Sequence, residues 1–146
     1  LRAAVSRRLE SLPALAGIPV VPEDRQNIKS EIDTALGKAG GLVITVSMGN
    51  ARGVAPADPL PQAEVEVVVE CAEIPAINRG PAGRQMPAVT ASVLAVCALH
   101  HWPWEHGNVL TFGETQYDRD DKTSLVIYTC IFNTRVTFAA QLGLGE

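Results

Sequence analysis

The stretch Gln62-Ala-Glu-Val-Glu-Val-Val-Val-Glu-Cys-Ala-Glu-Ile-Pro75 is the most regularly patterned part of this chain. Successive side chains of a strand point to opposite faces of a sheet, so an extended backbone here has one apolar face and one acidic face. The apolar face is made of Val65, Val67, Val69 and Cys71. The acidic face presents Glu64, Glu66 and Glu70. A strand buried on both faces is apolar almost throughout, so we predict an antiparallel sheet that is covered on one side only.

Length and composition predict one globular domain spanning residues 1–146. The chain is 47% hydrophobic and 19% charged, which suffices for a sizeable core. Its net charge of −4 argues against a protein that grips nucleic acid by neutralising phosphates. Cys71, Cys97 and Cys130 each fall in an apolar pattern, so we expect buried free thiols in a reducing compartment. Neither a membrane span nor a signal segment is evident, and these patterns favour the cytosol.

The order of elements predicts an α+β fold. Apolar residues at helical spacing predict an amphipathic helix over the first dozen residues, which Pro13 ends. Periodicity and turn residues place the remaining elements. These are an edge strand or extended connector in 16–22, a helix over 27–39, a buried strand at 42–47, the 62–75 strand, a helix over 88–101, and a hairpin of 110–117 with 124–138. The order α-β-α-β-β-α-β-β predicts a mostly antiparallel sheet with helices packed on one face.

Two glycine- and proline-rich segments, 49–61 and 75–87, flank the 62–75 strand and are expected to be long loops. In the helix over 88–101, the larger apolar residues define the expected buried face. They are Val89, Val93, Val96 and Cys97, continued by His100.

Three histidines form the strongest candidate for chemistry. His100, His101 and His106, together with Glu105, could in principle bind a metal ion. Adjacent residues of a helix point about 100° apart, however, which makes a site that uses both His100 and His101 difficult to build. We therefore expect polar residues at a helix end, with no metal, no cofactor and no catalytic residue.

Three other patterns have an ordinary and a functional interpretation. The glycines Gly80 and Gly83 suggest a phosphate-binding loop, but no lysine–serine pair follows them. Pro81 also removes a backbone N–H that the phosphate would need, so an ordinary loop is favoured. The acidic face of the 62–75 strand is either simply solvated or lines a passage for something negatively charged. Trp102 and Trp104 either close the core or contact another subunit.

Several phrases resemble the tail terminator, or tail completion, proteins of long-tailed bacteriophages and prophages. They are Arg79-Gly-Pro-Ala-Gly-Arg-Gln-Met-Pro-Ala-Val-Thr-Ala-Ser-Val-Leu94, the helix end Leu99-His-His-Trp-Pro103, and the closing hairpin to Phe138. The resemblance extends over nearly the whole chain but includes no catalytic motif. It implies a homo-oligomeric ring, commonly a hexamer, that caps the tail tube, ends its polymerisation and joins the tail to the head. The implied partners are the tail tube protein and the head–tail connector protein, in the host cytoplasm during assembly and then in the virion tail.

If a ring forms, the two long loops with Arg52, Arg79 and Arg84 are expected at the subunit interface, together with Trp102 and Trp104. Glu64, Glu66 and Glu70 would then line a lumen through which DNA passes without specific binding. Two alternatives remain open. One is another head–tail connector or minor capsid component, and the other is a small-molecule-binding or metal-dependent enzyme domain that uses the histidine cluster.

Overall fold

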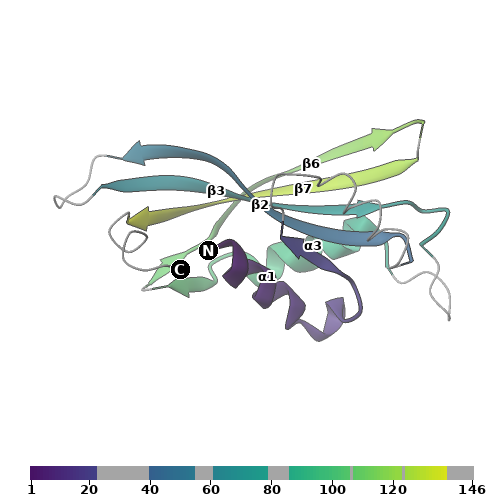
Figure 1. Cartoon of the computed structure of the whole chain (residues 1–146), viewed down its shortest axis with the longest axis horizontal. Helices are drawn as coiled ribbons and strands as arrows, with labels where there is room; N and C mark the ends of the chain where they lie inside the picture. Colours follow the sequence, from purple (N-terminus) through teal and green to yellow (C-terminus); the bar gives the residue numbers. More distant parts are fainter. Residues whose placement is uncertain (23–39, 55–60, 79–85, 106, 123, 138–146) are drawn as a thin grey trace.

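A five-stranded sheet forms the body of the protein (Figure 1). In this computed structural model its strands follow the order β1-β2-β3-β7-β6, and only the β1–β2 pair is parallel. The strands are β1 (Val20–Pro22), β2 (Leu42–Val54), β3 (Gln62–Glu73), β6 (Thr111–Asp120) and β7 (Leu125–Thr137). The described part of the chain comprises residues 1–22, 40–54, 61–78, 86–105, 107–122 and 124–137.

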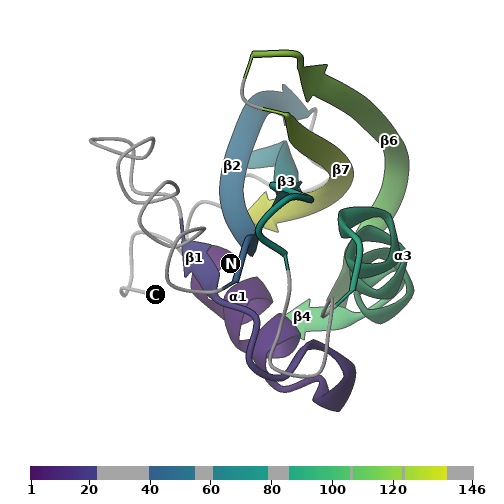
Figure 2. The same cartoon turned by 90° about the vertical axis from the view of Figure 1, so that its right-hand side faces the viewer.

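The helices of the described ranges pack against one face of this sheet, which we call the inner face. They are α1 (Arg2–Glu10) and α3 (Ala88–Leu99), and a 3-10 turn, η1 (Pro13–Leu15), follows α1. Figures 1 and 2 show both helices on the same side of the twisted, curled sheet. The predicted α+β class, with a mostly antiparallel sheet and helices on one face, is confirmed for the described residues. The helix predicted over 27–39 lies outside them.

The core forms where the apolar face of β3 meets the helices. Val67, Val69 and Cys71 are fully buried and share one cluster with residues of α1 and α3, such as Val5 and Leu99. Burial along β3 alternates residue by residue until it reaches Cys71. The alternation predicted for this strand is therefore confirmed, because β3 lies at the centre of a sheet whose helices cover one side.

Strand β2 is longer than expected. We predicted a loop from Gly49, but the β2–β3 ladder continues to the pair Val54 and Gln62. A register shift between Met48 and Ala51 accommodates Gly49, where an added Cβ would lie 2.8 Å from Glu66 Oε1. A close approach within the ladder therefore favours glycine here, since an added Cβ would also lie 3.0 Å from Glu66 Cβ, and the cross-strand partner overrides the local composition.

The buried face predicted for the helix over 88–101 is wrong. Small residues, rather than the larger ones, face the sheet, and they are Ala88, Ala91, Ser92 and Ala95, with Leu99 at the helix end. Val89 and Val93 are 42% and 56% exposed, and Cys97 is exposed as well. Because α3 carries no charged residue, its periodicity could not distinguish the two faces, and close packing selected the face with the shortest side chains.

A small hairpin that the sequence did not predict follows α3. The helix ends at Leu99, and His101 adopts φ 61°. The chain then forms β4 (Pro103–Glu105), which pairs with β5 (Asn108–Val109) before it enters β6. No helix among the described residues has both the length and the apolar character needed to cross a membrane.

Candidate assembly surfaces

The face of the sheet opposite the helices, which we call the outer face, carries the acidic row predicted from β3. Glu64, Glu66 and Glu70 alternate with the buried valines and are each partly exposed. The ladder extends the row sideways, because directly opposed residues of neighbouring strands share a face. Ile131 stands opposite both Val68 of β3 and Glu114 of β6. The same rule places Asp118 and Asp120 on the outer face, where they oppose Ile127 and Leu125.

The sequence reasoning missed the carboxylates of β6, although a signal for them was present. Glu114, Gln116, Asp118 and Asp120 recur at every second residue, which is the strand period. The register thus brings six carboxylates onto one face, from β3 and β6, with β7 between them. Strands separated by one intervening strand lie about 10 Å apart, which is close to a Debye length at physiological salt. Charges at neighbouring positions of β3 and β6 therefore reinforce one another, whereas Glu64 and Asp120, at the two ends of the face, lie roughly 30 Å apart along the strands and are screened from each other.

Two arginines of the described chain stand at the Glu64 end of this face. Arg52 Nη2 donates to Glu64 Oε2 at 2.9 Å, and Arg135 stands opposite Glu64 on the other neighbouring strand. The backbone N–H of Asn50 donates to Glu66 Oε1 at 3.0 Å. Because the Arg52 side chain is 79% exposed, this ion pair contributes only roughly 0.2–1 kcal/mol to stability. The six carboxylates outnumber these two arginines, so the described residues give the outer face a net negative charge.

The predicted interface arginines fall into two groups. Arg52 lies on the β2 ladder, paired with Glu64, rather than in a long loop as expected. Arg79 and Arg84 lie outside the described residues, so their interface role stays a prediction.

Both tryptophans are half-buried and pack against the main core, as a lid on the core requires. Trp104 Nε1 donates to Thr134 Oγ1 at 2.8 Å. The Arg8 guanidinium lies 5.9 Å from the centre of a Trp102 ring, and Arg8 Nε donates to the carbonyl of Ala98 at 3.3 Å. These contacts join α1, α3 and the β4–β5 hairpin, and a subunit contact through the exposed remainder of each indole stays a prediction.

His100 and His101 do not diverge as a continuing helix would require. Their rings stack with centroids 3.9 Å apart, because the helix has already ended and His101 turns back. His100 Nδ1 accepts a hydrogen bond from the backbone N–H of Phe112 at 3.1 Å. His106 lies outside the described residues. Within the described part of the chain, no three His, Cys, Asp or Glu side chains come together as metal ligands would.

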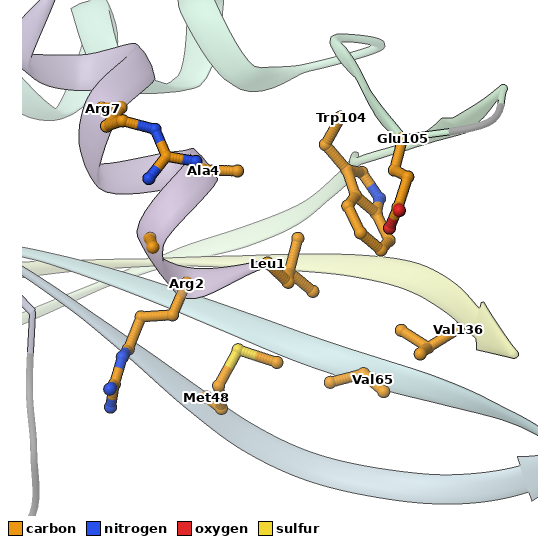
Figure 3. Close-up of a pocket in the computed structure, with 10 residues that line it drawn as sticks. Leu1, Arg2, Ala4, Arg7, Met48, Val65, Trp104, Glu105 and Val136 are labelled. Atoms are coloured by element: carbon orange, nitrogen blue, oxygen red, sulfur yellow. The ribbon is translucent and has the colours of Figure 1, made fainter. Parts of the chain in front are cut away.

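A groove of about 710 Å³ lies between the first turns of α1 and residues of the strands β2, β3, β4 and β7 (Figure 3). Its apolar floor is formed by Met48, Val65, Val136 and Trp104. Arg2 and Arg7 line it from α1, and Glu105 lines it near Trp104. This volume is that of a pocket for a small ligand or for a few protein side chains.

Comparison with solved structures finds the same fold in a chain described as "Virion of native gene transfer agent (GTA) particle". The TM-score is 0.61, the sequence identity is 18%, and the match covers 94% of each chain. This likeness shows the fold, over almost the whole length of both chains. No protein-family model matches the sequence. No curated protein matches it at a significant level either.

Proposed function

We propose that this chain is a structural subunit of a phage or prophage virion. The observation that carries the proposal is the match to a virion chain over 94% of both lengths. More specifically, we propose a tail terminator: a ring, commonly a hexamer, that caps the tail tube, ends its polymerisation and provides the head-joining surface. The resemblance in element order and local phrases supports this finer assignment. The tail tube protein and a head–tail connector protein are then its partners.

The outer face suits the lumen of such a ring. DNA that enters or leaves the head must pass the ring without adhering to it, and the carboxylates of Glu64, Glu66, Glu70 and Glu114 repel phosphate at close range. The same face would be a poor site for DNA binding, which depends on phosphate neutralisation by cations. This role is structural and needs no catalytic residue, metal or cofactor.

Removing the chain from a genome that produces such particles tests the assignment. A terminator's absence should give tail tubes of uncontrolled length and heads without tails, visible by negative-stain electron microscopy. A different head–tail connector would instead leave tails of normal length that fail to join heads. Particles of normal length and normal infectivity would contradict both structural roles.

A further inference from the structure

The end of the β6–β7 hairpin is the most exposed regular structure of the described chain. We call residues 117–122 and 124–128 the arm. Nine of the ten residues of β6 are exposed, so the described chain leaves this edge strand largely uncovered. Such an edge presents backbone donors and acceptors to another molecule. The arm is therefore available for a contact between chains.

An aromatic pair gives the arm an anchor. Tyr117 is 58% exposed, more than any other large hydrophobic side chain in the described ranges. Its ring lies 5.2 Å from that of Tyr128, which packs on the core, so the Tyr117 ring has an aromatic partner on one side and is open to solvent on the other. Tyrosine combines a large apolar body with a polar tip and is enriched where proteins meet.

The charge of the arm differs between its two faces. Asp118 and Asp120 lie on the outer face of β6, while Tyr117 and Arg119 lie on the inner face with Tyr128 and Val126. Asp118 and Asp120 each accept one backbone N–H within the arm, from Arg119 and Lys122, and both carboxylates remain exposed. A strand that enters a pocket by its free edge therefore offers an aromatic ring on one side and carboxylates on the other.

The groove has the complementary chemistry. Its floor of Met48, Val65, Val136 and Trp104 is apolar. Arg2 and Arg7 stand along the α1 side, and the carboxylate of Glu105 lies at the opposite side, near Trp104 (Figure 3). Arg7 is exposed at the surface of α1. An aromatic side chain accompanied by carboxylates fits this combination of an apolar floor and a cationic wall.

Position also favours a contact between two copies. The arm lies at one end of the long axis of the molecule, whereas the N-terminal end of α1, beside the groove, lies near the middle of that axis, away from the arm (Figure 1). A chain cannot close this contact on itself. Two different patches that complement each other generate a head-to-tail assembly, which is the type of interface that a closed ring requires.

We propose that the arm of one subunit docks in the groove of the next, with Tyr117 on the apolar floor and Asp118 facing Arg7. This inference rests on the proposed ring and names the surfaces that close it. It makes the contact partly electrostatic, so association should weaken as salt increases.

Charge reversal on the full-length chain tests the contact. Arg7→Glu and Asp118→Arg should each reduce self-association at least tenfold by analytical ultracentrifugation, because each places like charges together. A one-to-one mixture of the two variants should recover assembly, since every arm then finds a groove of opposite charge. Glu10→Arg, an equal charge reversal on α1 away from the groove, should assemble like the unchanged chain. Thermal unfolding followed by circular dichroism checks that each variant folds.

The outcomes separate this contact from the ring itself. Rings that form normally in both charge-reversal variants would overturn the arm–groove contact and leave the proposed ring standing. The arm–groove contact is overturned in the same way if both variants lose assembly and their mixture does not recover it, because the arm and the groove then meet other surfaces. An unchanged chain that stays monomeric at every concentration, alone and on tail tubes, would overturn both proposals.

Discussion

Glu73 Oε1 accepts a hydrogen bond from the backbone N–H of Ala88 at 2.9 Å, which joins the end of the central strand to the first turn of α3. Its other oxygen accepts from Asn78 Nδ2 at 2.7 Å, and that amide also donates to the carbonyl of Met86. Glu73 is only 2% exposed, and Asn78 is fully buried. One carboxylate thus satisfies a free N–H of the helix start and fixes the chain on both sides of 79–85.

Glu73→Ala should therefore destabilise the fold by about 2–3 kcal/mol, because it leaves buried donors of Asn78 and Ala88 unpaired. Urea unfolding measures the change in the free energy of unfolding. Glu73→Gln keeps one acceptor oxygen of the same size and should cost less than the alanine variant. Equal losses for the two variants would contradict this account, since packing volume would then matter more than hydrogen bonding.

Gly41 is a second position at which backbone geometry constrains the sequence. It has φ 93°, and a Cβ there would lie 2.7 Å from the backbone nitrogen of Asn78. Gly41→Ala should cost about 1–3 kcal/mol for the left-handed conformation, with a further loss from the clash. Gly53→Ala is a matched control, because a Cβ at Gly53 meets nothing within 4 Å. Comparable unfolding free energies for the two variants would contradict the steric argument.

The cysteines should differ sharply in reactivity. Cys97 is exposed on α3, whereas Cys71 and Cys130 are buried. Burial raises the pKa of Cys71 and that of Cys130, so neither thiol ionises near neutral pH. A colorimetric thiol reagent should modify one cysteine per folded chain at pH 8 and all three after unfolding. Cys97→Ser should abolish the reaction of the folded chain, and rapid modification of all three native thiols would contradict the assigned burial.

The raised pKa of the buried thiols should also make the stability of the fold depend on pH. A thiol whose pKa is raised by folding favours the unfolded state once the unfolded thiol ionises, so stability falls as pH rises above about 8.5. The loss should be smaller in Cys71→Ala than in the parent chain when each is compared with its own stability at pH 7. Urea unfolding at pH 7 and at a pH above about 8.5 measures the loss of unfolding free energy for each chain. Identical losses in the two chains would show that Cys71 does not contribute to the pH dependence.

Sequence reasoning identified β3 and the β6–β7 hairpin because alternation with period two has a single structural interpretation there. It failed at α3, where every side chain is small, apolar or uncharged and only the packed sheet selects a face. It failed at 49–54, where glycine suggested a loop but the β3 ladder holds the strand. The groove could not be anticipated, since Arg7, Met48 and Trp104 meet only through tertiary packing.

Glu66→Lys/Glu70→Lys should convert the outer face from a surface that repels DNA into one that retains it. Glu64 is left unchanged, because a lysine there would face both Arg52 and Arg135 and destabilise the ladder through like charges. Glu66 and Glu70 are partly exposed, so the fold should survive the change. Filter binding of the assembled protein should show DNA retention that falls as salt rises from about 50 mM to about 200 mM.

A matched pair of single variants separates the position of the charges from their number. Glu66→Lys and Glu10→Lys make the same change in net charge, the first on the outer face and the second at an exposed site of α1 outside both the outer face and the groove. If the outer face lines a lumen, the first variant should retain DNA that is threaded through the ring much more strongly than the second. Equal retention by both variants would mean that only total charge matters. Normal assembly without any gain in retention at low salt would mean that the outer face lies away from the path of the DNA.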